Sequence, residues 1–266
     1  MPKTQPKAPH DPTKLLRPQA QRTAPRDIPF QSLKHTPAYV IDVPGLEANL
    51  ERLQWFKQAS GAKILLAQKA FSAFPFYGLI AQYLDGTCSS GLYEAKLAHE
   101  YMPEREIEVF CPGYKTEEFP ELFSIADTLI FNTFTQLERY RKWLKTEGSK
   151  VKRSPEKAIA TPRLGLRINP EISSVETEIY NPAGPYSRLG MTIENFAEGA
   201  KTYGLNDISG LHFHVLCEEN ADALAKAWNR VKAKFSPYLE HMAWINMGGG
   251  HHLTRKDYDL DLAQEI

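Results

Sequence analysis

The sequence lacks an excess of charge of one sign, a cysteine framework and a long apolar run. Lys plus Arg and Asp plus Glu both number 32 in 266 residues, so no net charge indicates a nucleic-acid or membrane-surface partner. The three cysteines are an odd number, lie far apart and favour a reducing compartment over disulfide bonding. No apolar run approaches the roughly 18 residues of a membrane span, and the N-terminus has no apolar signal-peptide core. These absences predict a soluble, cytoplasmic protein.

Residues 1–30 also lack the periodic apolar pattern of a folded segment. They hold seven prolines and six Lys or Arg against two Asp. Such a stretch buries too little apolar surface to offset its ordering entropy, so we expect a disordered tail over 1–33. The prolines argue against the amphipathic helix of a transit peptide. The folded domain is predicted over 34–266.

What the folded part has is alternation of strand and helix. Helices are predicted at Pro44–Ala59, Leu92–Tyr101, Thr133–Lys145 and Ala221–Phe235. Strands are predicted at Lys63–Gln68, Gly86–Cys88, Ile107–Phe110, Thr128–Phe131, Leu164–Asn169, Ile208–Val215 and Ala243–Met247. Alternation with short loops implies a parallel sheet, and seven units favour a (β/α)8 TIM-like barrel over an open sheet.

An eight-stranded barrel needs one more strand to remove its edges, so we expect the sequence to be the front part of a longer protein. A further short strand is predicted ahead of the barrel at Thr36–Asp42, after a proline. The polar, proline-containing stretch Thr146–Thr161 is predicted to be a surface loop.

The first candidate for chemistry is Lys69, which follows the apolar run of Ala62–Phe71. A cation at the carboxyl end of a buried parallel strand lies where α/β barrels place their active sites. Desolvation there favours the neutral amine, the form that attacks a carbonyl. Lys69 is therefore a candidate Schiff-base lysine, and the alternative is a strand-end lysine that reaches solvent.

The second candidate is the pair His212 and His214, which share one face of a predicted strand. Such a pair can indicate a metal site, as in barrel hydrolases, but it is more often one packed, hydrogen-bonded histidine followed by one at the strand end. A metal needs at least a third ligand. His251 and His252 are the best candidates for that ligand, but they lie in a loop with a better explanation.

That loop is Asn246–His252, in which Gly248, Gly249 and Gly250 follow an apolar strand. Consecutive glycines let the backbone approach an anion and offer N–H groups to it. Barrels often bind phosphate in the loops after strands seven and eight. A lysine, a ring-facing histidine and phosphate-binding glycines together specify pyridoxal phosphate (PLP).

Seven segments, in chain order, carry a resemblance to a known family: TPAYVID, LLAQKAF, CSSGLYEA, LGLRINP, SRLG, GLHFHVLCE and NMGGGHH. The chain resembles the fold-III, alanine racemase-type PLP decarboxylases, and within them the carboxynorspermidine/carboxyspermidine decarboxylases of polyamine biosynthesis. The similarity runs from about residue 34 to the end. It implies a PLP-dependent carboxy-lyase that acts as a cytoplasmic homodimer.

The resemblance also implies roles for particular residues. Lys69 would carry PLP as a Schiff base, His214 would stack on the cofactor ring, and the three glycines would hold the phosphate. Arg167 would lie near the cofactor, the alternative being a buried arginine with a structural partner.

For the substrate, Glu218 and Glu219 are candidates to meet ammonium groups, and Glu218 is expected to do so. For Glu219 a solvent-exposed acid at a helix start is the favoured alternative. Arg188 matches a basic position that relatives fill with Lys, and it is expected either to contact the substrate or to anchor a loop.

Departures from the family pattern qualify these expectations. Leu216, Cys217 and Glu218 stand where ornithine-decarboxylase relatives have a Gly-Ser pair that binds phosphate, which favours the polyamine branch. The acid that pairs with the pyridine nitrogen, and a cysteine-bearing β-domain that completes the site across a dimer, are expected after residue 266. The strand Thr36–Asp42 is expected to belong to that β-domain.

Three other functions remain open from the sequence. One is a diaminopimelate decarboxylase-like enzyme, and another is a non-catalytic barrel that only binds PLP. The third is a metal-dependent hydrolase built on His212 and His214.

Overall fold

The computed structural model describes residues 30–175, 179 and 181–266. The disordered tail predicted over 1–33 therefore lies almost wholly outside the described residues. Its last part is described, and there Phe30–Ser32 forms a short 3-10 helix. Other 3-10 helices are Phe74–Phe76, Thr116–Glu118 and Gly148–Lys150.

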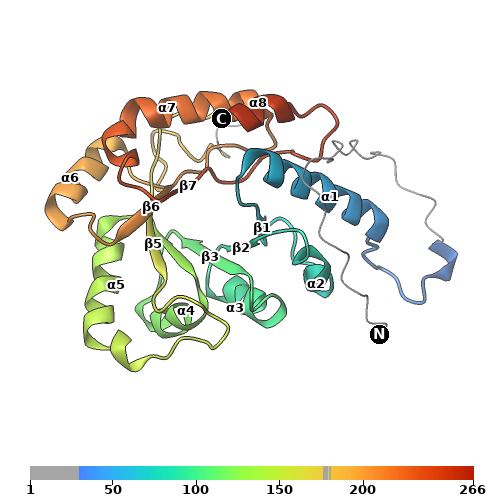
Figure 1. Ribbon diagram of the computed structural model, residues 1–266, viewed down its shortest axis with the longest axis horizontal. Helices are drawn as coiled ribbons and strands as arrows, with labels where there is room; N and C mark the ends of the chain where they lie inside the picture. The colour runs from blue at the N-terminus through green and yellow to red at the C-terminus, as the bar shows by residue number, and fades with distance from the viewer. Residues whose placement is uncertain (1–29, 176–178, 180) are drawn as a thin grey trace.

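Parallel strands paired in chain order form one sheet of seven described strands that curls into a half-barrel (Figure 1). The strands are β1 Leu65–Ala67, β2 Gly86–Ser89, β3 Glu106–Cys111, β4 Thr128–Phe131, β5 Arg163–Arg167, β6 Ile208–His212 and β7 Trp244–Asn246. The helices are α1 Val43–Ser60, α2 Tyr77–Ile80, α3 Leu92–Tyr101, α4 Phe119–Ile125, α5 Phe134–Thr146, α6 Ile193–Tyr203, α7 Ala221–Leu239 and α8 Leu260–Glu265. A helix follows every strand, which confirms the predicted barrel-type α/β fold.

Local signals explain where the helices begin and end. Pro44 stands in the first turn of α1, where its missing N–H costs nothing. Gly61 ends that helix in the left-handed conformation, with its N–H donating to Lys57 O at 3.0 Å. Thr133 caps α5 by accepting a hydrogen bond from the Gln136 N–H. The predicted helices agree with the observed ones because such caps are visible in the sequence.

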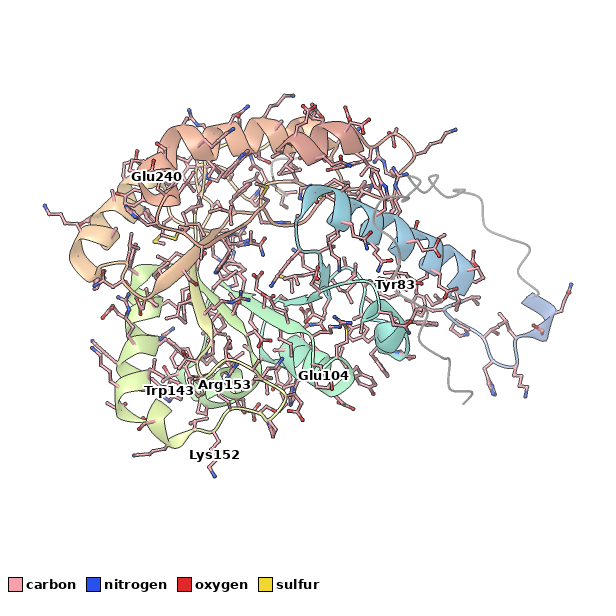
Figure 2. All side chains as sticks on the ribbon, in the orientation of Figure 1. Tyr83, Glu104, Trp143, Lys152, Arg153 and Glu240 are labelled. Atoms are coloured by element: carbon pink, nitrogen blue, oxygen red, sulfur yellow. The ribbon has the colours of Figure 1, made fainter. Side chains whose placement is uncertain are left out.

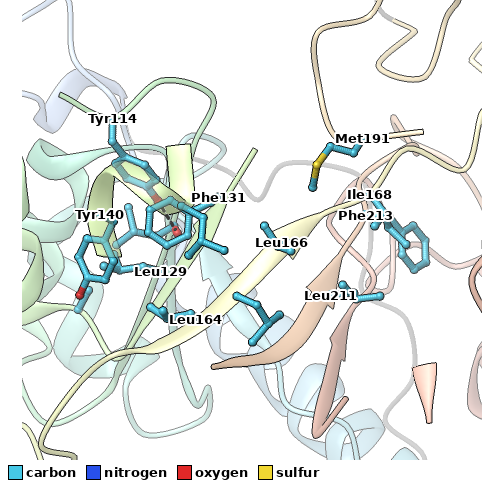
Figure 3. Packing of buried hydrophobic residues seen from close by; sticks show 14 of the residues in the cluster. Tyr114, Leu129, Phe131, Tyr140, Leu164, Leu166, Ile168, Met191, Leu211 and Phe213 are labelled. Carbon is cyan, nitrogen blue, oxygen red and sulfur yellow. Dashed lines mark hydrogen bonds between the residues drawn. The ribbon is translucent and has the colours of Figure 1, made fainter. Parts of the chain in front are cut away.

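Side chains crowd the space between the sheet and its helices (Figure 2). The outward-facing residues of the strands form the main core (Figure 3). Full burial of one large apolar side chain of this core contributes about 1.5–3 kcal/mol to the stability of the fold. The strand residues of this core include Ile107, Val109, Leu129, Phe131, Leu164, Leu166 and Leu211, and Phe213 joins them just after β6.

The first helix, α1, lies beside the last, α8 (Figure 1). Arg52 is buried on α1 and donates from Nε to Leu253 O at 2.7 Å and from Nη2 to Arg255 O at 3.2 Å. Phe56 packs in the same cluster as Leu260. The helical layer is thus joined end to end, although β1 and β7 do not pair with each other in the described sheet.

The prediction of a strand at Thr36–Asp42 is wrong. These residues form no strand, and Tyr39 is fully exposed. An extended segment becomes a strand only when an edge accepts its backbone hydrogen bonds, and no described strand lies beside this one.

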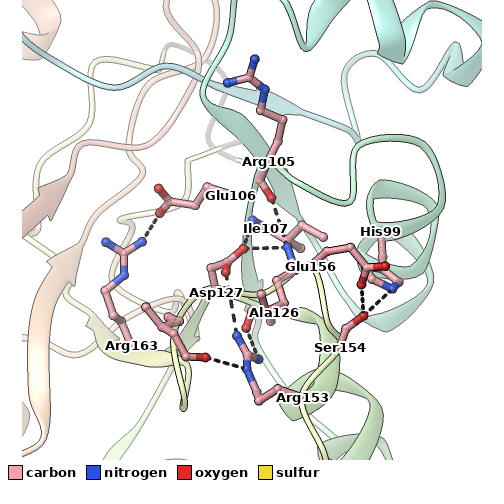
Figure 4. Close-up of polar contacts among 12 residues, drawn as sticks. His99, Arg105, Glu106, Ile107, Ala126, Asp127, Arg153, Ser154, Glu156 and Arg163 are labelled. Carbon is pink, nitrogen blue, oxygen red and sulfur yellow. Dashed lines mark hydrogen bonds and ion pairs between the residues drawn. The ribbon is translucent and has the colours of Figure 1, made fainter.

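The predicted loop after α5 is irregular apart from Gly148–Lys150, but it is held firmly to the barrel (Figure 4). Arg153 donates from Nη1 to Ala126 O at 2.6 Å. Lys157 is buried, and its ammonium group lies 2.9 Å from Asp127 Oδ2. Asp127 Oδ2 also accepts from the Ile107 N–H, so one carboxylate joins the loop to β3.

Candidate active site

The hollow side of the half-barrel is polar because strand residues alternate between its two faces. On β6 and just beyond it, Phe213 faces outward and stacks against Trp228 of α7 with ring centroids 6.3 Å apart. Its neighbours His212 and His214 therefore lie on the hollow side. On β3, Glu108 has the same inward position.

Lys69 follows β1 at the carboxyl end of the sheet. The N–H groups of Ala70 and Phe71 both donate to Ala67 O, at 3.0 and 3.2 Å, so the chain turns tightly there. The Lys69 side chain is exposed. Its positive charge adds to the burial that lowers the pKa of His214, and it partly offsets the burial that raises the pKa of the Cys88 thiol, so Lys69 acts electrostatically on both side chains.

Gln68 fixes the strand end that presents Lys69. Its buried amide donates to Ser89 Oγ at 2.7 Å and to Glu94 O at 3.0 Å. Its oxygen accepts from the Tyr77 hydroxyl at 3.0 Å. A buried amide with three hydrogen bonds leaves this strand end little freedom to move, and so fixes the backbone from which Lys69 projects. The sequence analysis missed this residue.

His214 is held as a neutral imidazole. Its Nδ1 accepts from the Gly249 N–H at 2.9 Å, which leaves the ring proton on Nε2. Burial, with the nearby charges of Lys69 and Arg167, lowers the pKa of His214 to about 3. The ring therefore carries no charge near neutral pH.

Arg167 ends β5 with its guanidinium buried on the hollow side. Nη2 donates to His214 O at 3.1 Å, and the group lies 4.6 Å from the centroid of the Phe110 ring. Burial lowers the pKa of Arg167 to about 10, so the side chain remains charged at neutral pH. Its Nε has no hydrogen-bond partner among the described residues, which leaves a buried N–H able to meet an anion.

The glycine loop after β7 is held by its own surroundings. The Gly248 N–H donates to Asn246 Oδ1 at 2.7 Å, and the His251 ring hydrogen-bonds the Gly248 backbone. Gly248 and Gly250 have φ angles of 76° and 88°, a backbone conformation that residues with a Cβ rarely adopt. The N–H groups of Gly248 and Gly249 thus both donate within the protein. The role of the three glycines in phosphate binding stays a prediction.

Glu108 and Asn246 face each other across the hollow, and the sequence analysis missed both. Asn246 Nδ2 donates to Glu108 Oε1, and the Cys88 thiol also hydrogen-bonds the carboxylate. Burial raises the pKa of Glu108 to about 7, with a smaller contribution from Glu106. The alternation of acidic and apolar residues along β3 is a signal that could have identified an inward-facing carboxylate.

The expected substrate residues lie further out. Glu218 is exposed and has a φ of 59°. Glu219 is half-buried, its N–H donates to Gly250 O at 3.0 Å, and its Oε2 is buried without a hydrogen-bond partner in the described chain. Arg188 is exposed, and its carbonyl accepts from Asn132 Nδ2 at 2.8 Å. The structure therefore brings Lys69, His214, Arg167 and the glycine loop together and leaves the Glu218 and Arg188 side chains at the exposed edge.

The described histidines of the barrel do not form a recognisable metal site. Over the described residues, no group of three or more His, Cys, Asp or Glu is placed to hold a metal ion. His212 is buried and hydrogen-bonds Asn246, and burial lowers its pKa well below the usual range. His251 Nδ1 lies 3.4 Å from the Tyr258 hydroxyl, so the third ligand considered from the sequence has another partner.

The described helices lack the combined length and hydropathy of a membrane span. In the part of the chain that the structure describes, none is both long and apolar enough to cross a bilayer.

Comparison with known proteins places this site in context. No protein-family profile matches the sequence. A carboxynorspermidine/carboxyspermidine decarboxylase from Campylobacter jejuni is 40% identical over 232 residues, which cover 87% of this chain and 56% of that protein. Over most of its own length the chain is thus similar in sequence to these decarboxylases. The resemblance drawn from the sequence is thereby confirmed.

Two further matches agree with this similarity. A carboxyaminopropylagmatine decarboxylase from Synechocystis is 34% identical over 228 residues, covering 86% of this chain and 54% of that protein. The crystal structure of carboxynorspermidine decarboxylase from Campylobacter jejuni with norspermidine superposes with a TM-score of 0.70 at 36% identity. It covers 84% of this chain and 52% of that structure. The chain spans about half the length of the relatives that it matches.

Diaminopimelate decarboxylase, the sequence-based runner-up, matches in fold alone. Its crystal structure from Helicobacter pylori with L-lysine has a TM-score of 0.60 at 18% identity, covering 81% of this chain and 56% of that one.

Proposed function

We propose that the chain forms the cofactor-binding barrel of a PLP-dependent decarboxylase that converts carboxynorspermidine or carboxyspermidine to the polyamine. The observation that carries the proposal is the meeting of Lys69, a neutral His214 and the buried Arg167 beside a glycine loop. The 40% identity to a carboxynorspermidine/carboxyspermidine decarboxylase supports it.

The residues present fit PLP. The orphaned Nε of Arg167 is a buried donor suited to an anionic group. His214 offers a flat, uncharged ring, which packs against an aromatic cofactor without adding positive charge. Gly249 leaves open space, because a Cβ there would come no closer than 3.7 Å to the His214 ring. The loop can therefore admit a phosphate near its backbone.

When bound, PLP withdraws the electron pair left by the departing carboxylate. The protein's residues bind and orient. Lys69 would hold the cofactor covalently through its amine, from the strand end that Gln68 fixes. His214 would hold one face of the ring, and Arg167 would keep positive charge beneath the site. The Gly249 N–H, which donates to His214 Nδ1 in the ligand-free chain, would donate to the phosphate instead when PLP binds.

The substrate class follows from charge. A carboxylated polyamine carries several ammonium groups, and the unpartnered Glu219 Oε2 is a ready acceptor for one of them. Glu218 and Arg188 are proposed to contact the substrate at the exposed edge. The Synechocystis relative favours carboxyaminopropylagmatine as a second candidate substrate for the same reaction. A cytoplasmic homodimer, in which a partner copy completes the site, is part of the proposal.

Chemical labelling tests the role of Lys69. Protein incubated with PLP and reduced with borohydride should carry the cofactor on Lys69, as peptide mass spectrometry would show. Lys69→Ala should abolish the label, whereas Lys63→Ala should retain it, because Lys63 pairs with Glu106 before β1. Label on another lysine, or label that persists in Lys69→Ala, would sink the assignment.

A further inference from the structure

One hydrogen-bonded chain crosses the hollow of the half-barrel and ends in the glycine loop. Glu108 lies on β3 and Asn246 ends β7, two strands that are not neighbours in the sheet. Asn246 Nδ2 donates to the Glu108 carboxylate, and Asn246 Oδ1 accepts from the Gly248 N–H at 2.7 Å. Glu108 and Asn246 are 138 residues apart in the sequence.

The chemistry of the two ends fixes which way the Asn246 amide points. A backbone N–H can only donate, so the amide oxygen must face Gly248. The NH₂ group must then face Glu108, whose carboxylate accepts. The Asn246 carbonyl is held as well, since it accepts from the Phe213 N–H at 3.0 Å. Asn246 is thus fixed at both its main chain and its side chain.

The Glu108 carboxylate is itself confined. Its side chain is 4% exposed, and the Cys88 thiol hydrogen-bonds it from β2. The chain of contacts therefore runs from Cys88 to Glu108 and reaches the loop through Asn246.

We propose that Glu108 is a positioning residue that, through Asn246, holds the Gly248 N–H and so sets the shape of the glycine loop for phosphate. Only the final step, phosphate binding, rests on the proposed function. The contact from Glu108 to the loop is a property of the ligand-free chain and is tested without cofactor.

Amide hydrogen exchange at Gly248 in the ligand-free chain tests the contact. Glu108→Leu removes the acceptor and leaves the Asn246 NH₂ unpaired, so Gly248 should exchange about tenfold faster. Glu108→Gln should stay near the wild-type rate, because its amide oxygen still accepts from Asn246 while its NH₂ turns to the Cys88 sulfur. Glu106→Gln is the matched control, since Glu106 pairs with Lys63 and Arg163.

The Leu129 amide in the core of β4 reports global opening in the same spectra. An unchanged Gly248 rate in Glu108→Leu would overturn the proposal. So would a rise that merely tracks Leu129, or an equal rise in Glu106→Gln.

A binding comparison tests the step to phosphate. Glu108→Leu should weaken binding of PLP about tenfold and leave binding of pyridoxal, which lacks the phosphate, within about threefold of wild type. Equal weakening of both would overturn the phosphate step. If wild-type protein binds neither compound, the proposed function fails, while the exchange experiment still decides whether Glu108 positions the loop.

Discussion

Gly248 and Gly249 are neighbours in one loop, yet a methyl group would meet different surroundings at each. At Gly248 the backbone has a φ of 76°, and a Cβ would lie 2.5 Å from Phe213 O. At Gly249 a Cβ would meet only the His214 ring, at ordinary contact distance. Gly248 is therefore needed for the fold of the loop, while Gly249 is needed only if something approaches its backbone.

We therefore expect Gly249→Ala to keep the wild-type melting temperature and to weaken PLP binding about tenfold, because the methyl group hinders phosphate at the N–H. Gly248→Ala should lower the stability of the ligand-free protein by about 1–3 kcal/mol through strain. Urea unfolding and absorbance titration measure the two effects. If Gly249→Ala binds PLP as wild type does, phosphate does not reach that N–H.

At the scale of elements, the loop after α5 acts as a clasp on the amino-terminal side of the barrel. Figure 4 shows Arg153 reaching carbonyl groups at the end of α4, one of them Ala126 O, and Asp127 in contact with the β3 backbone. Arg153 also donates from Nε to Ile159 O at 3.2 Å, within its own loop. Helix ends expose carbonyl groups that need donors, and one guanidinium supplies several.

Arg153→Ala should lower the free energy of unfolding by about 1–3 kcal/mol, because buried carbonyl groups lose their donor. Lys152→Ala is the matched control, since Lys152 is exposed and projects outward (Figure 2). Its effect should stay within about 0.5 kcal/mol. Urea denaturation measures both, and equal effects would show that the clasp contributes nothing specific.

At the scale of the whole molecule, sequence periodicity predicted the order of strands and helices because each pattern is local. The strand ends were predicted less exactly, since β6 ends at His212 and not at the predicted Val215, but the strand order was enough to propose Lys69 and His214 as neighbours. Contacts across the hollow were not predictable, because the curvature of the sheet alone brings Glu108 to Asn246. The failed strand at Thr36–Asp42 has the same cause, since pairing depends on an edge that the segment's own residues do not encode.

The contact between α1 and α8 has a consequence for how the protein folds. One side of α1 packs near its own sequence neighbours, with Leu50 in a cluster with Tyr77 and Ile80. The other side carries Arg52, whose hydrogen bonds to Leu253 and Arg255 span 201 and 203 residues. Contacts of such separation carry a large closure entropy and tend to form late.

Arg52→Ala should therefore speed unfolding about tenfold and leave the refolding rate nearly unchanged, as stopped-flow measurements in urea would show. Slowed refolding instead would place α1 in the folding nucleus. During synthesis the order is fixed by the ribosome. The Arg52 side of α1 emerges early and has no binding surface until α8, some 200 residues later, has left the exit tunnel. Until then Leu253 and Arg255, whose carbonyl groups accept from Arg52 in the folded protein, have not been made, so this side of α1 stays open to other molecules such as a chaperone.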